Sequence, residues 1–157
     1  MIIEPIGWVS SPRRASVDDN WDSVTATINL DGDRFAPEAL LGLDQFSHVE
    51  VVYLFDQVDP RTVHTGSRRP RDNPAWPEVG IFAQRARARP NRIGVSVCRL
   101  LGVDGLAVTA HALDAIDGTP VLDLNPYMAE FAPRGDVHQL TWSRQLMAGY
   151  WDASAVC

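Results

Sequence analysis

Arginines are concentrated in one part of an otherwise acidic chain. The net charge is −6, and all 14 basic residues are arginine. Residues 61 to 92 hold two acids and eight of these arginines: Arg61, Arg68, Arg69, Arg71, Arg85, Arg87, Arg89 and Arg92. A local net charge of +6 is typical of a face that binds polyphosphate or nucleic acid. The alternative is that these arginines pair with carboxylates from elsewhere in the fold.

The stretch RARARPNRIG, residues 85 to 94, has the spacing for a row of guanidinium groups. If the chain is extended here, its period of two places Arg85, Arg87 and Arg89 on one face. Pro90 would then end the strand pairing. The pattern predicts a row at the lip of a sheet, suited to bidentate contact with phosphate or carboxylate. The alternative is a solvated edge strand that its charges protect from aggregation.

A second stretch, LDAIDGTPVLDLNPYM, residues 113 to 128, is rich in carboxylates. Asp114 and Asp117 flank a tight turn, and Asp-Gly is first of all a hairpin signal. Carboxylates beside a turn can also accept from a ribose or bind an ammonium group. Asn125, Pro126 and Tyr127 break the following strand. Tyr127 is therefore a candidate to project into a site, and Asp123 is a second polar candidate there.

Other chemical motifs are absent from the sequence. There is no G-x-G-x-x-G after a strand, no P-loop and no G-x-S-x-G around Ser96. The four histidines lack metal-ligand spacing, so no metal is expected. Cys98 and Cys157 lie far apart, and Cys98 is expected in the core. No apolar run is long enough for a membrane helix, and the N-terminus has no signal-peptide pattern, so a cytoplasmic location is expected.

Short apolar segments separated by glycine, proline and aspartate predict a mainly β domain spanning residues 1–157. The predicted strands are residues 2–9, 23–30, 48–55, 79–84, 93–101, 106–113 and 120–124. The links at 102–105 and 114–120 are short enough for antiparallel hairpins, which favours a barrel or a sandwich. Helices are predicted at 36–43 and 136–151, the second with Asp136 and Gln139 as a capping box. The proline-rich loop 56–80 is long enough to suggest a function.

Four stretches, taken together, resemble the TrmO family, also called TsaA-like proteins. They are GIFAQRARARPNRIGVSVCRL, LDAIDGTPVLDLNPY, GLDQFSHVEVVYLFDQ and SRRPRDN, and the likeness runs from about Ile6 to Phe131. The chain departs from the family pattern at Arg92, where the family has proline, at Asn125, where it has lysine, and at Asp56, where it has histidine.

The resemblance implies a small closed or partly closed β-barrel with short helices and a C-terminal helix. It also implies a homodimer that binds S-adenosyl-L-methionine without a Rossmann domain. The implied cofactor-binding residues are Arg85, Leu100, Asp114, Ala115, Ile116, Asp117, Asp56 and Gln57. The expected RNA-binding residues are Arg87, Arg89, Asn91, Arg92, Arg69 and Arg71. The catalytic residue is open, with Asp123 and Tyr127 as candidates.

The leading hypothesis is therefore an S-adenosylmethionine-dependent methyltransferase. Its expected reaction is N6-methylation of threonylcarbamoyl-adenosine next to the tRNA anticodon. The alternatives are a methyltransferase of the same fold that acts on a small molecule or another acceptor, and a non-catalytic RNA- or ligand-binding module. Salt dependence separates them, because RNA binding releases counterions and weakens steeply as salt rises.

Overall fold

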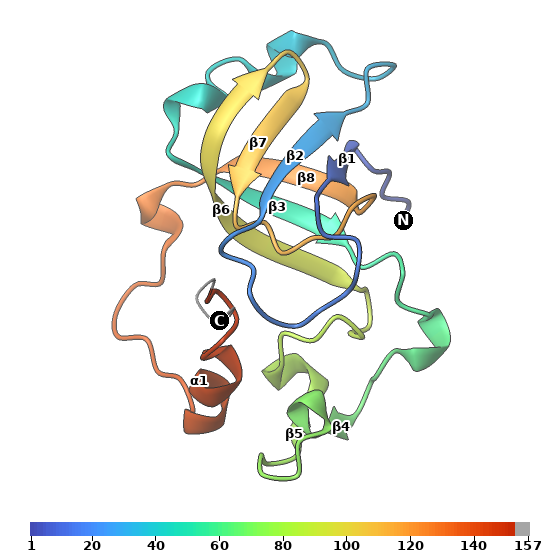
Figure 1. Cartoon of the computed structure of the whole chain (residues 1–157), viewed down its shortest axis with the longest axis vertical. Helices are drawn as coiled ribbons and strands as arrows, with labels where there is room; N and C mark the ends of the chain where they lie inside the picture. Colours follow the sequence, from blue (N-terminus) through green and yellow to red (C-terminus); the bar gives the residue numbers. More distant parts are fainter. Residues whose placement is uncertain (153–157) are drawn as a thin grey trace.

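A computed structural model describes residues 1–152, and in it a closed antiparallel barrel has the strand order β1-β2-β7-β6-β3-β8 (Figure 1). The barrel strands are β1 (Gly7–Ser10), β2 (Thr25–Leu30), β3 (His48–Leu54), β6 (Ile93–Asp104), β7 (Ala107–His111) and β8 (Pro120–Pro126). The structure confirms the mainly β barrel and decides against the sandwich, because β1 pairs with β8 and closes the sheet.

The strands form where the sequence alternates. In β3 every second residue is buried, and Val49, Val51 and Tyr53 face the core. Tyr53 lies directly against Gly94 on β6, where a Cβ would come within 2.5 Å of the tyrosine ring. Gly94 therefore leaves the space that this large side chain needs inside a narrow barrel.

One predicted hairpin is present and the other is not. Strands β6 and β7 pair through a turn at Gly105, whose φ of 58° suits glycine. The link 114–120 joins strands that do not pair, because β7 lies between β2 and β6 whereas β8 lies between β1 and β3. Its backbone turns toward the chain after β1 instead: Asp117 N donates to Arg13 O, and Gly118 N donates to Val9 O.

Helical structure is shorter than predicted. In place of the predicted helix 36–43 there are two 3-10 turns, Pro37–Leu40 and Leu43–Gln45. The second turn extends beyond the predicted range. The C-terminal helix α1 covers only Thr141–Met147, and the predicted capping box at Asp136 and Gln139 is wrong. Leu140 is the N-cap and makes no side-chain cap bond. Beyond the helix, the carbonyls of residues 149–151 accept from the backbone N–H groups of residues 20–22.

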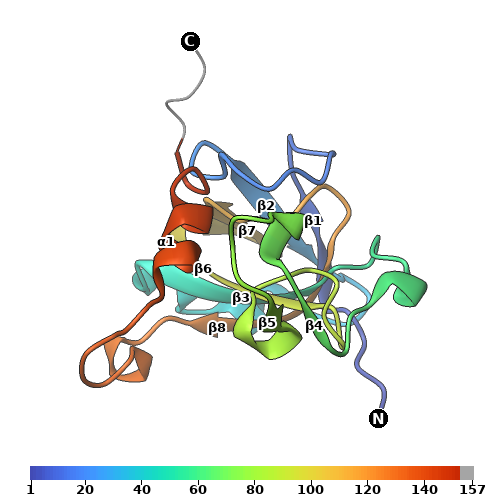
Figure 2. The ribbon, with the colours of Figure 1, turned by 90° about the horizontal axis from the view of Figure 1, so that it is seen from below.

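Beneath the barrel the chain forms small elements (Figure 2). They are the two-stranded sheet β4 (Ser67–Arg68) with β5 (Val79–Gly80), the 3-10 turns Pro60–Thr62, Pro70–Asp72 and Ile81–Ala83, and helix α1; a further 3-10 turn, Ala129–Phe131, follows β8. The predicted strand 79–84 is thus mostly a turn. Loop 56–80 contributes β4, β5 and two of the 3-10 turns.

Cys98 is buried in the core as predicted, and Cys157 lies outside the described residues. In residues 1–152, every helix is too short or too polar to cross a membrane.

Candidate functional site

The predicted arginine row does not form. After the turn Ile81–Ala83 the chain is irregular up to β6, and the edge-strand alternative is equally wrong. Gln84 begins this segment, and its buried side-chain amide donates to the carbonyls of Arg68 and Val79, both at 3.0 Å, which ties the segment to β4 and β5. Arg92 closes a second turn, with its N–H on Arg89 O and a φ of 53°.

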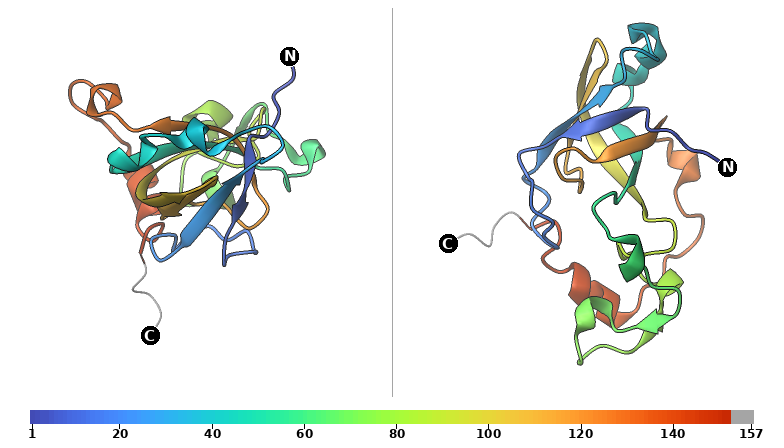
Figure 3. Two further views of the ribbon diagram at one scale, coloured as in Figure 1. Left: turned by 90° about the horizontal axis from the view of Figure 1, so that it is seen from above. Right: turned by 90° about the vertical axis from the view of Figure 1, so that its right-hand side faces the viewer.

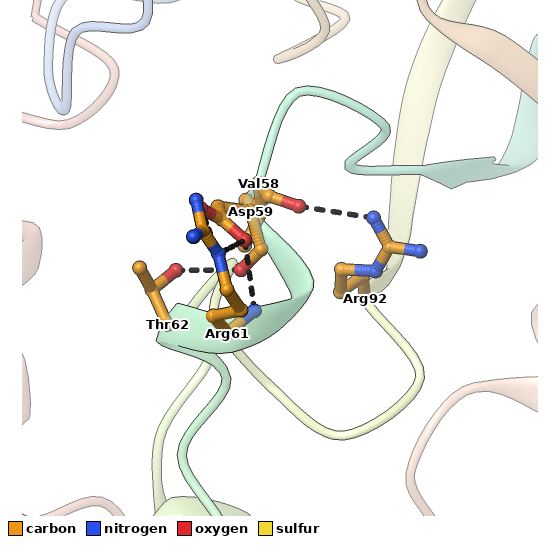
Figure 4. Close-up of polar contacts among 5 residues, drawn as sticks. All are labelled: Val58, Asp59, Arg61, Thr62 and Arg92. Carbon is orange, nitrogen blue, oxygen red and sulfur yellow. Dashed lines mark hydrogen bonds and ion pairs between the residues drawn. The ribbon is translucent and has the colours of Figure 1, made fainter.

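The arginines of this segment, residues 85–92, bind backbone carbonyls rather than acids. Arg85 donates to Val95 O at 2.6 Å, and Arg92 to Val58 O at 3.0 Å (Figure 4). Arg89 reaches Gln84 O at 3.4 Å, and Arg87 is exposed. Within residues 1–152 no carboxylate lies at ion-pair distance from any of the four. Their positive charges therefore remain available to an anion.

Three of the four arginines in residues 61–71 have acidic partners. Arg61 and Asp59 lie 2.6 Å apart, as Figure 4 shows. Arg71 holds both carboxylate oxygens of Asp19, at 2.8 and 3.0 Å. Arg68 contacts Asp72 at 3.4 Å. Arg69 is the exception, since it donates to the carbonyl of Trp76. The ion-pair interpretation therefore holds for three arginines of this stretch, and anion binding by the arginines of residues 85–92 stays a prediction.

The carboxylate of Asp114 lies in a cage of three hydroxyl groups. Tyr53 on β3 donates to Asp114 Oδ1 at 3.0 Å, and Ser96 on β6 donates to the same oxygen. Tyr150, which follows α1, donates to Oδ2. Tyr53 and Ser96 are buried and come from paired strands. The carboxylate of Asp114 thus lies at one end of the core, next to β3 and β6.

The cage holds a negative charge without neutralising it. Burial, and then the charge of Asp114, raises the pKa of both Tyr53 and Tyr150 far above the ordinary tyrosine value, so both remain donors at neutral pH. The positive charges of Arg85 and Arg71 partly oppose the pKa shift of Tyr150. Among the described residues no basic group forms an ion pair with Asp114. The arrangement therefore suits a cationic ligand.

Cys98 lies near this carboxylate but has no reactive character. Burial, and then the charge of Asp114, raises the pKa of its thiol to about 12. The thiol points to Ala112 O at 3.8 Å. Because the thiolate is the nucleophile, Cys98 is a core residue at neutral pH.

The structure spreads the other predicted cofactor residues along the barrel end and wall. Asp117 accepts from Ser11 N at 3.1 Å and lies 3.7 Å from Arg14. Ala115 is in the core, Leu100 packs against it, and Ile116 is half-buried. Asp56 and Gln57 are exposed just after β3. Of these residues, only Asp114 is joined to the hydroxyl cage.

Neither candidate catalytic residue is joined to the hydroxyl cage of Asp114. Asp123 is exposed on β8 and accepts from Leu124 N at 2.9 Å. The ring of Tyr127 contacts the ring of His48, with 6.4 Å between centroids. His48 begins β3 whereas Tyr53 is near its end, so Tyr127 lies toward the opposite end of that strand from the cage.

Sequence reasoning missed the three hydroxyl donors. Alternation along β3 and β6 places Tyr53 and Ser96 inward, so the strand pattern carried a signal for both. Tyr150 carried none, because the sequence places it within the predicted helix 136–151, whereas the observed helix ends at Met147.

The fold and site define a class: a small antiparallel barrel with an unpaired, hydroxyl-bound carboxylate at one end and unneutralised arginines beside it. A family model for the tRNA-methyltransferase O N-terminal domain matches residues 9–132. The chain belongs to this family. The match confirms the resemblance seen in the sequence.

Similar proteins agree with this assignment. A rat (Rattus norvegicus) tRNA (adenine(37)-N6)-methyltransferase is 34% identical over 99% of this chain. A probable S-adenosyl-L-methionine-binding protein of Methanothermobacter thermautotrophicus is 33% identical over 85% of this chain and 94% of its own length. A crystal structure of TrmO from Pseudomonas aeruginosa, 31% identical, superposes with a TM-score of 0.70 and covers 88% of this chain and 60% of that one. The chain spans only 37% of the length of the rat relative.

Proposed function

We propose that this chain is an S-adenosyl-L-methionine-dependent methyltransferase that methylates N6 of adenosine 37 in tRNA. The adenosine would carry a threonylcarbamoyl group, next to the anticodon. The family match and the names of the relatives support the reaction. The archaeal relative supports cofactor binding by a protein of about this length. The observation that carries the proposal is the unpaired carboxylate of Asp114 beside Arg85, because the cofactor carries both cationic and anionic groups.

The charges of the site complement the cofactor. S-adenosylmethionine has a sulfonium, an ammonium and a carboxylate. The caged Asp114 is suited to a cationic group, and Arg85 is suited to the carboxylate because its bond to Val95 O leaves its charge uncompensated. Leu100, Ala115 and Ile116 would supply apolar walls, and Asp117, Asp56 and Gln57 polar edges. The residues present therefore fit this group.

Positioning is the expected source of catalysis. The cofactor supplies an electrophilic methyl group, and the chain must hold the acceptor nitrogen in line with it. A rigid barrel with a carboxylate fixed by three donors provides such a frame. Asp123 and Tyr127 stay candidates for polar groups near the acceptor, since neither side chain bonds to Asp114.

We propose that tRNA binds over the segment 82–92. Arg87, Arg89, Arg92 and Asn91 would contact phosphates there, with Arg69 nearby in the chain that packs on Gln84. Phe82 is 77% exposed in the same segment, and such a ring can stack on an unpaired base. Arg71 contributes less, because Asp19 already neutralises it.

We also propose that residues 1–157 act as one domain in a cytoplasmic homodimer. Val97 and Leu101 support the dimer, because both apolar side chains are exposed on the outward face of β6. A second copy would cover this face.

Isothermal titration with S-adenosylmethionine and S-adenosylhomocysteine tests the cofactor. We expect both to bind, and Asp114→Asn to weaken S-adenosylmethionine, whereas Asp123→Asn leaves its affinity unchanged. Equal weakening of both ligands by Asp114→Asn would mean that the carboxylate binds the ammonium or the ribose, because both ligands carry these groups. Weakening of S-adenosylmethionine alone assigns it to the sulfonium. Absence of binding to the folded protein would overturn the proposal.

Methyl transfer to tRNA with and without the threonylcarbamoyl group tests the substrate. Product on adenosine 37 supports the proposal. Cofactor binding without methylation of either tRNA would leave a ligand-binding module or a small-molecule acceptor.

A further inference from the structure

The chain after α1 forms a strap across the barrel end. Residues 149–151 run beside residues 20–22, as the right-hand view of Figure 3 shows. Three backbone bonds join them: Asn20 N to Gly149 O at 3.1 Å, Trp21 N to Tyr150 O at 2.9 Å and Asp22 N to Trp151 O at 3.2 Å. The strap lies outside residues 9–132, which the family model matches.

The loop that receives the strap is itself firmly held. The Arg13 guanidinium donates to Asp19 O at 2.9 Å and to Asn20 O at 2.7 Å, and it lies 4.2 Å from the ring centroid of Trp21. Arg71 binds the carboxylate of Asp19 from below. Trp21 is almost fully buried. The strap therefore pairs with a fixed partner.

Helix α1 provides a second anchor for the strap. Trp76 Nε1 donates to Gln145 Oε1 at 2.9 Å, which ties α1 to loop 56–80. Beside this bond an open, mainly apolar cavity is lined by both segments, including Pro77, Leu140 and Trp142. The strap is thus held by its own backbone and, through α1, by loop 56–80, and Tyr150 is the middle of its three paired residues.

Tyr150 makes the contact that the other cage residues cannot make. Tyr53 and Ser96 both bind Oδ1 of Asp114, whereas Tyr150 is the donor to Oδ2 in the described part of the chain. Donors on one oxygen leave a carboxylate free to rotate about them, and a donor on the second oxygen fixes its plane. The three donors together therefore fix the plane of the carboxylate. Because all three are neutral, they leave its negative charge in place.

We propose that Tyr150 is a positioning residue that orients Asp114 toward the cationic part of S-adenosylmethionine, and that the C-terminal strap is a working wall of the cofactor site. The inference rests on the proposed function and goes beyond it, because it assigns a role in the site to a segment that the family match omits.

The test is a double-mutant cycle with isothermal titration of S-adenosylmethionine. Tyr150→Phe removes the hydroxyl but keeps the ring, which packs on Trp151 with 4.9 Å between centroids. We expect its Kd to rise about tenfold, as for the loss of one hydrogen bond to a charged group. In an Asp114→Asn background the same change should have little effect, because Tyr150 acts through Asp114. Ser143→Ala is the matched control, because it also removes one hydroxyl, which donates to Leu140 O at the start of α1, and it should leave the Kd unchanged.

A role in folding alone would give a different result. In that case Tyr150→Phe lowers the Tm but not the affinity of the remaining folded protein, or its effect persists with Asp114→Asn. Either result overturns the inference. If Tyr150→Phe does not fold, Gln145→Leu loosens the strap through Trp76 and should raise the Kd only when Asp114 is present. Failure of the wild-type chain to bind would instead count against the proposed function.

Discussion

The arginine-rich stretches 61–71 and 85–92 use the same side chain in two ways. In residues 61–71, Arg61, Arg68 and Arg71 each have an acidic partner, so their charges are largely neutralised within the fold. In residues 85–92 the guanidinium groups of Arg85, Arg89 and Arg92 donate to carbonyls, and Arg87 is exposed. A carbonyl satisfies a donor but does not cancel a charge. Arginine density alone therefore does not locate an anion-binding face.

The largest expected effect comes from replacing three arginines in each stretch. The combined variant Arg87→Gln, Arg89→Gln and Arg92→Gln should weaken tRNA binding on the order of 100-fold, at about 1 kcal/mol for each lost contact. The slope of log affinity against log salt should fall by about 3. Filter binding over a salt series measures both.

The matched variant is Arg61→Gln, Arg68→Gln and Arg71→Gln, which removes the same formal charge. It should lower tRNA affinity much less. Equal losses from the two triple variants would contradict the comparison. A circular dichroism melt of each variant checks that the carbonyl contacts of Arg89 and Arg92 are not required for folding.

A single replacement should give a smaller effect of the same kind. Arg87→Gln removes an exposed guanidinium with no acidic partner in the described chain. We expect the salt slope to fall by about 1 and tRNA affinity to fall several-fold. Arg99→Gln, also exposed but on the barrel wall, is the control and should change neither quantity. The same result from both would mean that only total charge matters.

Arg71 should affect stability instead of RNA binding. Its side chain is 28% exposed and holds both oxygens of Asp19. Arg71→Gln should lower the free energy of unfolding by about 1 kcal/mol, which corresponds to roughly 2–4 °C in Tm. Differential scanning calorimetry measures this change. An unchanged Tm together with weaker tRNA binding would move Arg71 into the RNA-binding group.

The smallest effect concerns Arg61 and Asp59, whose pair is exposed (Figure 4). Hydrogen bonds from the Arg61 side chain and backbone lower the pKa of Asp59. A lowered carboxyl pKa stabilises the fold above the unfolded pKa of about 3.9, and that contribution is lost as the pH falls through the folded value. Arg61→Gln should bring the NMR titration of Asp59 back toward the ordinary value and lower the Tm at pH 7 only slightly, because water screens this exposed pair. A loss of Tm at pH 7 as large as that of Arg71→Gln would show that the pair is structural.

Two Asp-Gly turns show how far the sequence predicts the fold. Asp104-Gly105 and Asp117-Gly118 both place glycine at positive φ, as the dipeptide indicates. The first turn joins paired strands, and the second does not. Local chemistry fixes the turn, but barrel closure decides which strands become neighbours.

The candidate site divides in a similar way. Asp114 and Arg85 were predicted through the family resemblance, whereas the alternation along β3 and β6 carried a signal for Tyr53 and Ser96 that the prediction did not use. No local pattern places Tyr150 on Asp114, 36 residues earlier in the chain. That contact depends on where the strap pairs with residues 20–22.

The sequence alone determined the mainly β character, the positions of the barrel strands, the burial of Cys98 and the basic middle of an acidic chain. These follow from side-chain alternation, turn residues and composition, which act over a few neighbouring residues. The tertiary structure decided that the arginines form no row, that some are neutralised and others are not, and that three distant hydroxyls surround one carboxylate. Those features depend on which groups meet across the barrel end, and long-range packing sets these contacts.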